Sequence, residues 1–322
     1  MFKYVFFSDI KKDMSKIETE LYNNVEAPLA LLEESSKHLL RAGGKRIRPA
    51  VTLLAAKFYD YDFEKLLPLA VALELIHMAS LVHDDVVDAS DTRRGMPTVR
   101  AKWGNRISLH TGDYLFAKSL ILISKYEDKR IAKVLADVSI KMCQGEVQQI
   151  ATSFKINQNL RDYFYRIKRK TALLLSASCE LGGVVAGGPD GGIRSLKLFG
   201  YYIGMAFQIT DDILDMVADE KELGKALGGD IRQGIITLPA LYALRNSTQK
   251  SELSGILEKK SKSQEEVLRA ISIIKDSGGI EYSFKISDLF LAKAKSELKM
   301  LPDVKVKKKM SSMADFIGKR NY

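Results

Sequence analysis

The chain contains few of the residues that cross-link or interrupt a fold. It has two cysteines in 322 residues, Cys143 and Cys179, and no CxxC motif. This excludes a disulfide scaffold and a cysteine-rich zinc module, and it is typical of a reducing cytoplasm. The seven prolines lie far apart, which leaves room for long helices. We therefore expect a cytoplasmic protein that is held together by a buried core.

Long apolar runs are missing as well. Near the N-terminus a short apolar run ends at Ser8, and it is too short for a signal peptide. The most apolar stretch, residues 66–82, is interrupted by Pro68, Glu74 and His77. Since no uninterrupted run is long enough to cross a bilayer, we predict no transmembrane segment.

Charge of one sign is in excess. The formal net charge is +10, and residues 281–322 hold ten Lys/Arg against five Asp/Glu. A basic surface can attract nucleic acid, anionic lipid or phosphate-bearing small molecules. With 46% hydrophobic and 28% charged residues, the composition is that of a folded protein and not of a disordered one.

Apolar residues recur every three or four positions along most of the chain, which is the helical period. The first such face, 29–40, ends at Gly43-Gly44, and Pro49 can open the next helix. The same period continues through 64–88, 106–125, 128–153, 159–186, 193–219, 237–247, 263–276 and 280–300, with a short last helix after Pro302. No alternating strand pattern is evident. The predicted fold class is all-α, as a large single-domain helical bundle.

One acidic motif occurs twice, as Asp84-Asp85-Val86-Val87-Asp88 and as Asp211-Asp212-Ile213-Leu214-Asp215. The first and last aspartates of each copy share a helix face, near a helix C-terminus, where anions are unfavourable. Two such clusters call for a cation. Carboxylates without nearby cysteine favour Mg²⁺, which takes its remaining ligands from water and substrate phosphate. The alternative is two solvated acidic surfaces balanced by nearby basic side chains.

Cationic residues accompany the first motif. Arg93-Arg94 follow it directly, and adjacent guanidinium groups suit phosphate oxygens. Simple charge balance is the alternative there. Lys45 and Arg48 lie in a glycine turn before an expected helix N-terminus, a place that favours an anion. An ordinary basic loop is the alternative for this segment.

Three further residues can contact the same ligand. Lys170 lies in the basic stretch 166–170, for which a solvated helix face is the alternative. His77 lies about two helical turns before the first acidic motif, and Gln208 lies three residues before the second. A packed core histidine or glutamine is the alternative at these two positions.

Taken together, the motifs resemble those of the trans-isoprenyl diphosphate synthases (polyprenyl synthetases). The sequences GGKRIRP, HDDVVDASDTRRG, Lys170-Thr171, Gln208 with DDILD, and GDIRQG with TLP occur in the order of that family, between Gly43 and Leu241. The resemblance implies an isoprenoid synthase fold, in which the helices surround a central elongated cavity. It also implies one polyprenyl synthetase domain over 1–322, with a catalytic core of about 26–245 and C-terminal helices in 246–322.

The resemblance further implies the reaction. Family members condense isopentenyl diphosphate head to tail (1′–4) onto an allylic diphosphate, here of farnesyl or geranylgeranyl type, with as many as three Mg²⁺ ions bridged by substrate. The departing diphosphate takes the proton that is lost. The implied assembly is a homodimer, or a heteromer with a small second subunit. We expect no nucleic-acid partner and no membrane contact beyond peripheral association for product release.

Site residues carry over by position. The Mg²⁺ ligands would be Asp84, Asp88 and Asp211, supported by Asp85, Asp212 and Asp215. Isopentenyl diphosphate would be held by Lys45, Arg48, His77 and Arg94, and the allylic diphosphate by Arg93, Lys170, Thr171, Gln208 and Lys225. The catalytic set is then Asp84, Asp85, Asp88, Arg93, Lys170 and Asp211.

One position departs from the family pattern. Many members carry Lys in the GKxTLP segment, where this chain has Ile235. One cation on the allylic diphosphate is therefore missing. Turnover would be lower than is typical unless Lys225 and Arg232 compensate.

Small residues precede the first acidic motif on its helix. In short-chain relatives a Phe or Tyr near this level closes the tunnel for the growing product, whereas this chain has Ala79 and Ser80, with Leu73 and Ile76 below them. The tunnel is then open for about three helical turns, roughly 16 Å. We predict a heptaprenyl or octaprenyl product for quinone side chains.

Four other functions stay open at this point. A shorter-chain synthase, making geranylgeranyl or farnesyl diphosphate, would carry the same motifs. A class I terpene cyclase would need only one set of cations and would replace the second acidic motif. A non-catalytic or obligate partner subunit would bind prenyl diphosphate without turnover. Nucleic-acid binding is the weakest alternative. The phosphate-binding motifs account for part of the basic excess, and the lysine run 305–309 can be a solvated tail.

Overall fold

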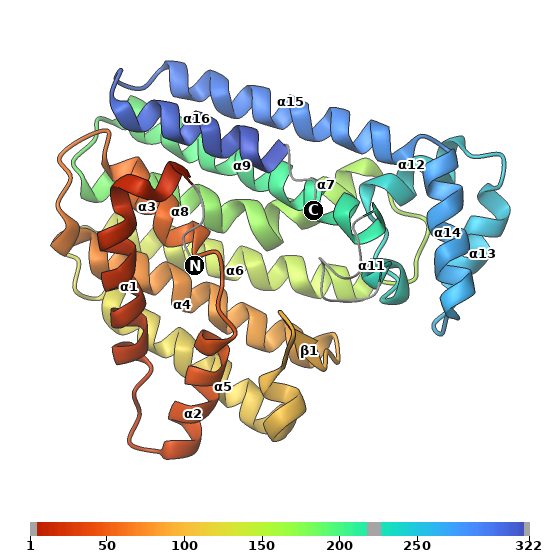
Figure 1. Ribbon diagram of the computed structural model, residues 1–322, viewed down its shortest axis with the longest axis horizontal. Coiled ribbons are helices and arrows are strands. Elements are labelled where there is room, and N and C mark those ends of the chain that lie inside the picture. Colours follow the sequence, from red (N-terminus) through yellow and green to blue (C-terminus); the bar gives the residue numbers. More distant parts are fainter. Residues whose placement is uncertain (1–4, 218–226, 319–322) are drawn as a thin grey trace. The chain divides into compact units, whose positions relative to one another are not determined.

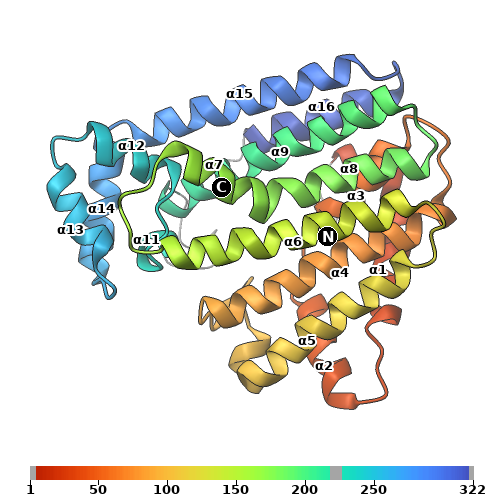
Figure 2. The same cartoon turned by 180° about the vertical axis from the view of Figure 1, so that it is seen from behind.

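The computed structural model describes residues 5–217 and 227–318. Up to α6, its elements are η1 (Val5–Ile10), α1 (Lys11–Asn24), α2 (Ala30–Arg41), α3 (Ile47–Ala56), α4 (Phe63–Val87), β1 (Thr92–Arg93), β2 (Met96–Pro97), α5 (Val99–Ile123) and α6 (Lys129–Thr152). The later ones are α7 (Leu160–Ile167), the π-helical turn η2 (Lys168–Ala172), α8 (Leu173–Val185), α9 (Asp190–Val217), α11 (Gly229–Arg232), α12 (Leu238–Asn246), α13 (Lys250–Glu258), α14 (Gln264–Asp276), α15 (Gly279–Lys299) and α16 (Lys305–Gly318). The all-α prediction is confirmed, as Figures 1 and 2 show.

The polar loop after α4 is the one place where the described chain forms strands. Strands β1 and β2 form a two-residue antiparallel pair, which the sequence did not predict. Arg94 and Gly95 connect them with φ of 54° and 75°, and positive φ at both central residues is the requirement of a tight hairpin turn. The turn therefore fixes two adjacent arginines next to the acidic end of α4.

The described residues fall into two compact units. Unit 1 contains the described residues of 1–137, 177–197 and 300–310, and unit 2 those of 138–176, 198–299 and 311–322. The first acidic motif belongs to unit 1 and the second to unit 2. Each motif can therefore be understood from the residues of its own unit.

Helix α4 is the core helix of unit 1. It is capped by Asp62, whose side chain accepts hydrogen bonds from the backbone N–H groups of Glu64 and Lys65, and helices α1, α3 and α5 pack against it (Figure 2). Among the described helices it alone is long and apolar enough to cross a membrane, but 67% of its most apolar window is buried within the protein. Such burial is the ordinary situation of a core helix.

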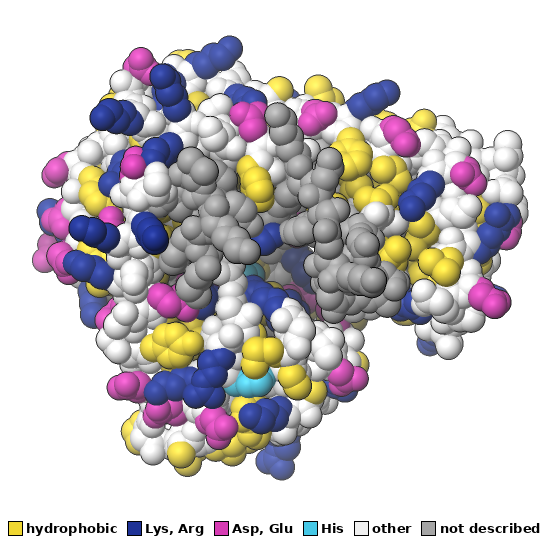
Figure 3. All heavy atoms as spheres, in the orientation of Figure 1, with side chains coloured by type: hydrophobic (Ala, Val, Ile, Leu, Met, Phe, Trp, Pro, Cys, Tyr) yellow, Lys and Arg dark blue, Asp and Glu magenta, His cyan; other side chains and the backbone are white. Residues whose placement is uncertain are grey.

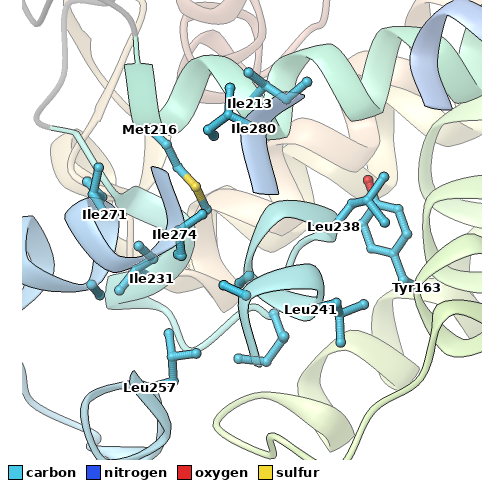
Figure 4. Close-up of a cluster of buried hydrophobic side chains, with 14 of the residues drawn as sticks. Tyr163, Ile213, Met216, Ile231, Leu238, Leu241, Leu257, Ile271, Ile274 and Ile280 are labelled. Atoms are coloured by element: carbon cyan, nitrogen blue, oxygen red, sulfur yellow. The ribbon is translucent and has the colours of Figure 1, made fainter. Parts of the chain in front are cut away.

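Unit 2 has its own apolar core (Figure 4). Its members come from helices α7, α9 and α11 to α15, and they include Tyr163, Ile213, Met216, Ile231, Leu238, Leu241, Leu257, Ile271, Ile274 and Ile280. Tyr163 is fully buried and is the polar member of this cluster. A buried phenol needs a hydrogen-bond acceptor, and the second acidic motif supplies it.

The basic excess is dispersed on the surface. On the face shown in Figure 3, Lys and Arg side chains are interspersed with Asp and Glu. The lysine run 305–309 was expected as a solvated tail, but it forms the first turns of α16, with Val306 buried. Lys309 Nζ lies 2.6 Å from Asp9 Oδ2. The run is therefore part of a packed helix.

Candidate active site

The first acidic motif lies at the C-terminal end of α4. Asp84 is in the last turn, and Asp88 is the C-cap residue, whose backbone N–H donates to the Asp84 carbonyl over 2.8 Å. Both side chains are half-buried, whereas Asp85 between them is only 1% exposed. Helical geometry over the motif places Asp84 and Asp88 one turn apart on the same face, as the sequence predicted.

The hairpin β1–β2 supplies the partner of Asp85. Arg93 donates from Nε to Oδ1 over 2.9 Å, and its Nη2 lies 2.8 Å from the same oxygen as an ion pair. Burying a carboxylate costs free energy unless a cation is paired with it. The contact fixes the hairpin to α4 and makes Asp85 a support for Arg93.

Arg48 and Arg94 surround His77 on α4. Burial, followed by the positive charges of Arg48 and Arg94, lowers the pKa of His77 well below its ordinary value. Burial also lowers the pKa of Arg48 to about 10. A neutral histidine among guanidinium groups is the composition of an anion site, because the arginines supply charge and the imidazole can donate a hydrogen bond.

Gly44 makes room for this cluster. A β-carbon at position 44 would lie 2.7 Å from Nη1 of Arg94, closer than atoms can approach without moving. The absence of a side chain lets the guanidinium of Arg94 lie against the backbone. Lys45, the next residue, is half-buried in the same turn. Unit 1 thus brings together three of the predicted isopentenyl diphosphate ligands and places Lys45 beside them.

Arg46 in the same turn was not predicted as a site residue, and the structure gives it an internal role. Its guanidinium donates two hydrogen bonds of 2.9 Å to Glu18 and one of 3.0 Å to Glu74. Burial alone would lower the pKa of Arg46, but these two carboxylates outweigh it and raise the pKa above its ordinary value. The sequence signal was Glu74, a lone acid within the apolar stretch 66–82.

The second acidic motif lies on α9. Asp212 is 4% exposed and accepts two hydrogen bonds, from Tyr163 Oη to Oδ2 over 2.7 Å and from Gln208 Nε2 to Oδ1 over 2.8 Å. Gln208 Oε1 in turn accepts a bond from the Thr171 hydroxyl over 2.6 Å. Thr171, Gln208, Asp212 and Tyr163 therefore form one hydrogen-bonded chain. The sequence did not identify Tyr163 as a site residue, because an aromatic residue at helical spacing is also typical of a packed core.

The hydrogen-bond partners of Asp212 are neutral, and burial decides the direction of its pKa shift. Burial raises the pKa of Asp212 to about 6, while the bonds from Gln208 and Tyr163 act in the opposite direction. Both polar atoms of the Gln208 amide, Oε1 and Nε2, already have a hydrogen-bond partner within the protein. Its predicted contact with the allylic diphosphate would therefore have to use its remaining hydrogen-bonding capacity.

Asp215 holds the chain that follows. Its Oδ2 accepts a hydrogen bond of 3.0 Å from the backbone N–H of Asp230, at the start of α11, and its backbone carbonyl accepts one of 2.8 Å from Gly228. Asp215 is 3% exposed. It acts as a cap and not as a solvated acid.

The position that lacks the family's lysine lies just beyond α11. Ile235 is half-buried, and its backbone N–H donates to the Asp230 carbonyl over 2.8 Å. Arg232, one of the two predicted compensating cations, bonds to the side chain of Gln264. Lys225, the other one, lies outside the described residues.

The Lys170-Thr171 step lies inside the π-helical turn η2, a feature that is frequent at functional sites. Lys170 Nζ lies 2.9 Å from Glu146 Oε2. A β-carbon at Gly204 on α9 would lie 2.6 Å from the Cα of Ala172, so the two backbones approach closely. Gln208 lies one turn beyond Gly204, which explains how α9 reaches Thr171.

A solvated basic face was the alternative for residues 166–170, and it is wrong for Arg166. This side chain is 4% exposed, and its Nη2 donates to the Ile236 carbonyl over 2.7 Å. Its Nη1 donates to Gln158 over 3.1 Å. Arg166 therefore joins α7 to the segment before α12.

The residues expected to line the product tunnel lie on α4. Leu73, Ile76 and Ala79 are buried, and half-buried Ser80 donates from Oγ to the His77 carbonyl over 2.8 Å. Their role in product length stays a prediction.

The first motif suits a magnesium ion that is held partly by substrate. Within residues 5–217 and 227–318, no three His, Cys, Asp or Glu side chains converge as a ready-made metal cage. Mg²⁺ does not need one, because it commonly uses one or two carboxylates with water and phosphate oxygens. Asp84 and Asp88, one helical turn apart, supply such a pair.

Known proteins are similar to this chain in sequence and in fold. The family model described as "Polyprenyl synthetase" matches residues 29–274. Heptaprenyl diphosphate synthase component 2 of Geobacillus stearothermophilus is 47% identical over 319 residues, which are 99% of this chain and 98% of that protein.

Two solved structures have the same fold. Heptaprenyl diphosphate synthase from Staphylococcus aureus aligns with a TM-score of 0.92 at 37% identity, over 97% of this chain and 99% of the other. A polyprenyl synthase from Caulobacter crescentus, complexed with calcium and isoprenyl diphosphate, aligns with a TM-score of 0.94 at 32% identity, over 98% and 97%.

Proposed function

Because the chain belongs to the polyprenyl synthetase family of prenyltransferases, we propose that it is a trans-polyprenyl diphosphate synthase of the cytoplasm. It condenses isopentenyl diphosphate onto an allylic diphosphate of farnesyl or geranylgeranyl type. Its product is a long all-trans chain of heptaprenyl or octaprenyl size for quinone side chains. Both compact units belong to one synthase domain over 1–322.

The observation that carries this proposal is the cluster of Arg48, Arg94 and neutral His77 in unit 1. Of its members, His77 lies on α4, which also carries the first acidic motif, Arg94 lies in the hairpin turn after that helix, and Arg48 lies on α3. It provides a set of cations in addition to the metal motifs. A synthase needs such a set because it holds two diphosphates, whereas a terpene cyclase holds one.

The residues divide the chemistry between them. Lys45, Arg48, His77 and Arg94 hold isopentenyl diphosphate. Arg93, Lys170, Thr171, Gln208 and Lys225 hold the allylic diphosphate, and Arg93 and Lys170 stabilise the negative charge on its leaving group. The C–O bond of the allylic diphosphate breaks, and diphosphate leaves with the electron pair. The double bond of isopentenyl diphosphate then attacks the allylic carbon, and the departing diphosphate takes the proton that is lost.

Magnesium ions would be held by Asp84, Asp88 and Asp211, with Asp85, Asp212 and Asp215 in support. When bound, Mg²⁺ neutralises charge on the diphosphate. Replacement of Asp84 or Asp211 by Asn should lower kcat by about two to three orders of magnitude. The unfolding free energy should change little at either position, which a denaturant titration of the same samples would check.

One assay tests the reaction. The purified chain is incubated with Mg²⁺, farnesyl diphosphate and labelled isopentenyl diphosphate, and the products are sized by chromatography. Long linear products support the proposal, and product that stops at geranylgeranyl size indicates a short-chain synthase. Cyclic hydrocarbon would instead indicate a terpene cyclase. Absence of turnover, in a chain that still binds isopentenyl diphosphate, would indicate an obligate partner subunit.

Product length is proposed to depend on the small side chains below the first motif. Ala79→Tyr should shorten the product by closing the tunnel at that level. Ala79→Ser, a small change in volume at the same position, is the matched control and should leave the length unchanged. An unaltered product from Ala79→Tyr would contradict this assignment.

Assembly with a second chain is the last part of the proposal. Ile140, Val147 and Ile150 of α6 are 59%, 65% and 53% exposed. Their spacing of seven and three residues, with exposed Cys143 between them, gives the apolar stripe of a helix-pairing seam. We assign this stripe to contact with a second copy of the chain. The Geobacillus stearothermophilus relative is named as a component, which keeps a heteromer with a second subunit as the alternative.

Light scattering tests the stripe. The assignment is supported if the wild-type chain is a dimer and the double variant Ile140→Asp/Val147→Asp is a monomer. Leu289→Asp is the control, because Leu289 on α15 is also 59% exposed but lies outside the stripe. A chain that is monomeric alone and pairs only with a different subunit would favour the heteromer.

A further inference from the structure

Glu74 is an unusual residue for its position. It lies in the middle of the apolar core helix α4 and is 2% exposed. Its Oε1 accepts a hydrogen bond of 3.0 Å from Arg46, while its Oε2 is buried and has no hydrogen-bond partner. A buried carboxylate is costly unless charges around it compensate. Its persistence therefore needs a reason beyond the single bond to Arg46.

The surroundings of Glu74 supply that reason. Its negative charge raises the pKa of Arg46, of Arg48 and of Arg94, and in Arg48 and Arg94 it opposes the lowering that burial causes. Arg48 also has a buried polar atom, Nε, without a hydrogen-bond partner. Glu74 thus binds Arg46 directly, and its charge opposes the effect of burial on Arg48 and Arg94, which belong to the proposed isopentenyl diphosphate site.

Glu18 provides the comparison. It pairs with Arg46 through both carboxylate oxygens, at 2.9 Å each. It therefore shares with Glu74 the task of holding Arg46, whose left-handed backbone, with φ of 48°, starts helix α3. The two acids differ in that, of their four carboxylate oxygens, only Oε2 of Glu74 is buried without a hydrogen-bond partner.

We propose that Glu74 is a positioning residue for isopentenyl diphosphate, as the buried counter-charge that holds Arg48 and Arg94 side by side. Without it the two guanidinium groups would repel one another and separate. With it, both guanidinium groups are already in place when the diphosphate binds. Less binding free energy is then lost to ordering the two arginines. This inference rests on the proposed function and says how that site is kept in place.

Direct binding tests the inference without turnover. Isothermal titration calorimetry measures the Kd of isopentenyl diphosphate for the full chain in metal-free buffer, for wild type, Glu74→Gln and Glu18→Gln. Both variants should lower the melting temperature, since each weakens the hold on Arg46. Glu74→Gln should weaken binding about tenfold, whereas Glu18→Gln should keep Kd within about twofold of wild type.

Each other result overturns the inference. Equal Kd values for wild type and Glu74→Gln would show that Glu74 is only structural, and tighter binding by Glu74→Gln would show that its charge opposes the ligand. An equal loss of affinity in both variants would show that the effect arises from Arg46, which both acids bind. If Glu74→Gln does not fold, Glu74→Asp replaces it. Its shortened carboxylate should weaken binding about threefold, and an unchanged Kd would count against the proposal.

The same experiment separates this inference from the proposed function. A wild-type chain that binds isopentenyl diphosphate but makes no product would disprove the synthase, while the comparison of Glu74→Gln with Glu18→Gln would still decide the role of Glu74. A wild-type chain that does not bind would overturn the inference. In an active enzyme, Glu74→Gln should raise the KM for isopentenyl diphosphate and leave the KM for the allylic diphosphate unchanged.

Discussion

The two acidic motifs have nearly the same sequence, yet the protein treats them differently. In the first, the buried middle aspartate, Asp85, is paired with the guanidinium of Arg93. In the second, Asp212 has only neutral donors, Tyr163 and Gln208, and its pKa is raised to about 6. The last aspartate differs too, since Asp88 ends a helix while Asp215 caps another. A repeated motif therefore does not predict repeated electrostatics.

The largest expected difference between the motifs concerns the charge partner of the first. Arg93→Met removes the guanidinium from buried Asp85 and leaves an uncompensated carboxylate. The unfolding free energy should fall by about 3 kcal/mol, measured by denaturant titration at neutral pH. The double variant Arg93→Met/Asp85→Asn should recover most of that loss. A single variant as stable as wild type would remove the contrast drawn between the two motifs.

A neutral partner should matter less. Tyr163→Phe keeps the ring in the unit 2 core but takes one hydrogen bond from Asp212. We expect a loss of about 2 kcal/mol, because a buried acceptor is left unsatisfied. Tyr201→Phe, a change of the same kind on α9, is the control and should cost less. If Tyr163→Phe and Arg93→Met lowered the unfolding free energy equally, a neutral donor would stabilise a buried aspartate as well as a guanidinium does.

The two last aspartates offer a sharper comparison. Asp215→Ala removes the cap on the start of α11 and should lower stability by about 1 kcal/mol. Asp88→Ala removes an anion from the C-terminal end of α4, where the helix dipole disfavours it, and should not lower stability by more than about 0.5 kcal/mol. Thermal unfolding of both variants without metal or substrate would measure the difference. Equal losses would mean that both aspartates serve as caps.

The last expected effect concerns pH and unit 1. The lowered pKa of His77 means that, below pH 6.5, the unfolded chain takes up a proton that the folded chain does not. Stability is therefore fully present above about pH 6.5 and falls as the pH decreases, by at most about 1.4 kcal/mol per pH unit. His77→Gln should flatten this dependence between pH 6.5 and 5.5. Parallel curves for the two proteins would show that His77 is protonated in the folded state.

Much of the fold could be predicted from periodicity. The long helices and the positions of both acidic motifs follow from apolar spacing and from the glycine and proline breaks. Helices α1, α11 and α13 were not predicted. The signal for α1 was present, since Met14, Ile17 and Leu21 have helical spacing and are fully buried. The helix predicted over 106–125 begins just after Gly104, whose non-helical backbone, with φ of 81°, lies inside α5.

The site was predictable to the extent that residue type determines role. Asp85 and Arg93 followed from the motif, but the sequence did not say that they bind each other. Tyr163 and Glu74 were missed because their roles come from tertiary packing, which brings them to partners on other helices. Arg46 shows the converse, since this basic residue lies inside a ligand motif, was not predicted as a site residue, and is bound within the core by Glu18 and Glu74.

The π-helical turn η2 limits how this region can change during evolution. Successive residues of an α-helix are rotated by about 100°, so the removal of one residue from 168–172 would turn α7 relative to α8. Tyr163 and Arg166 would then leave the unit 2 core, even though the helix would be only slightly shorter. Natural variants of this segment should therefore differ by substitution and keep its length.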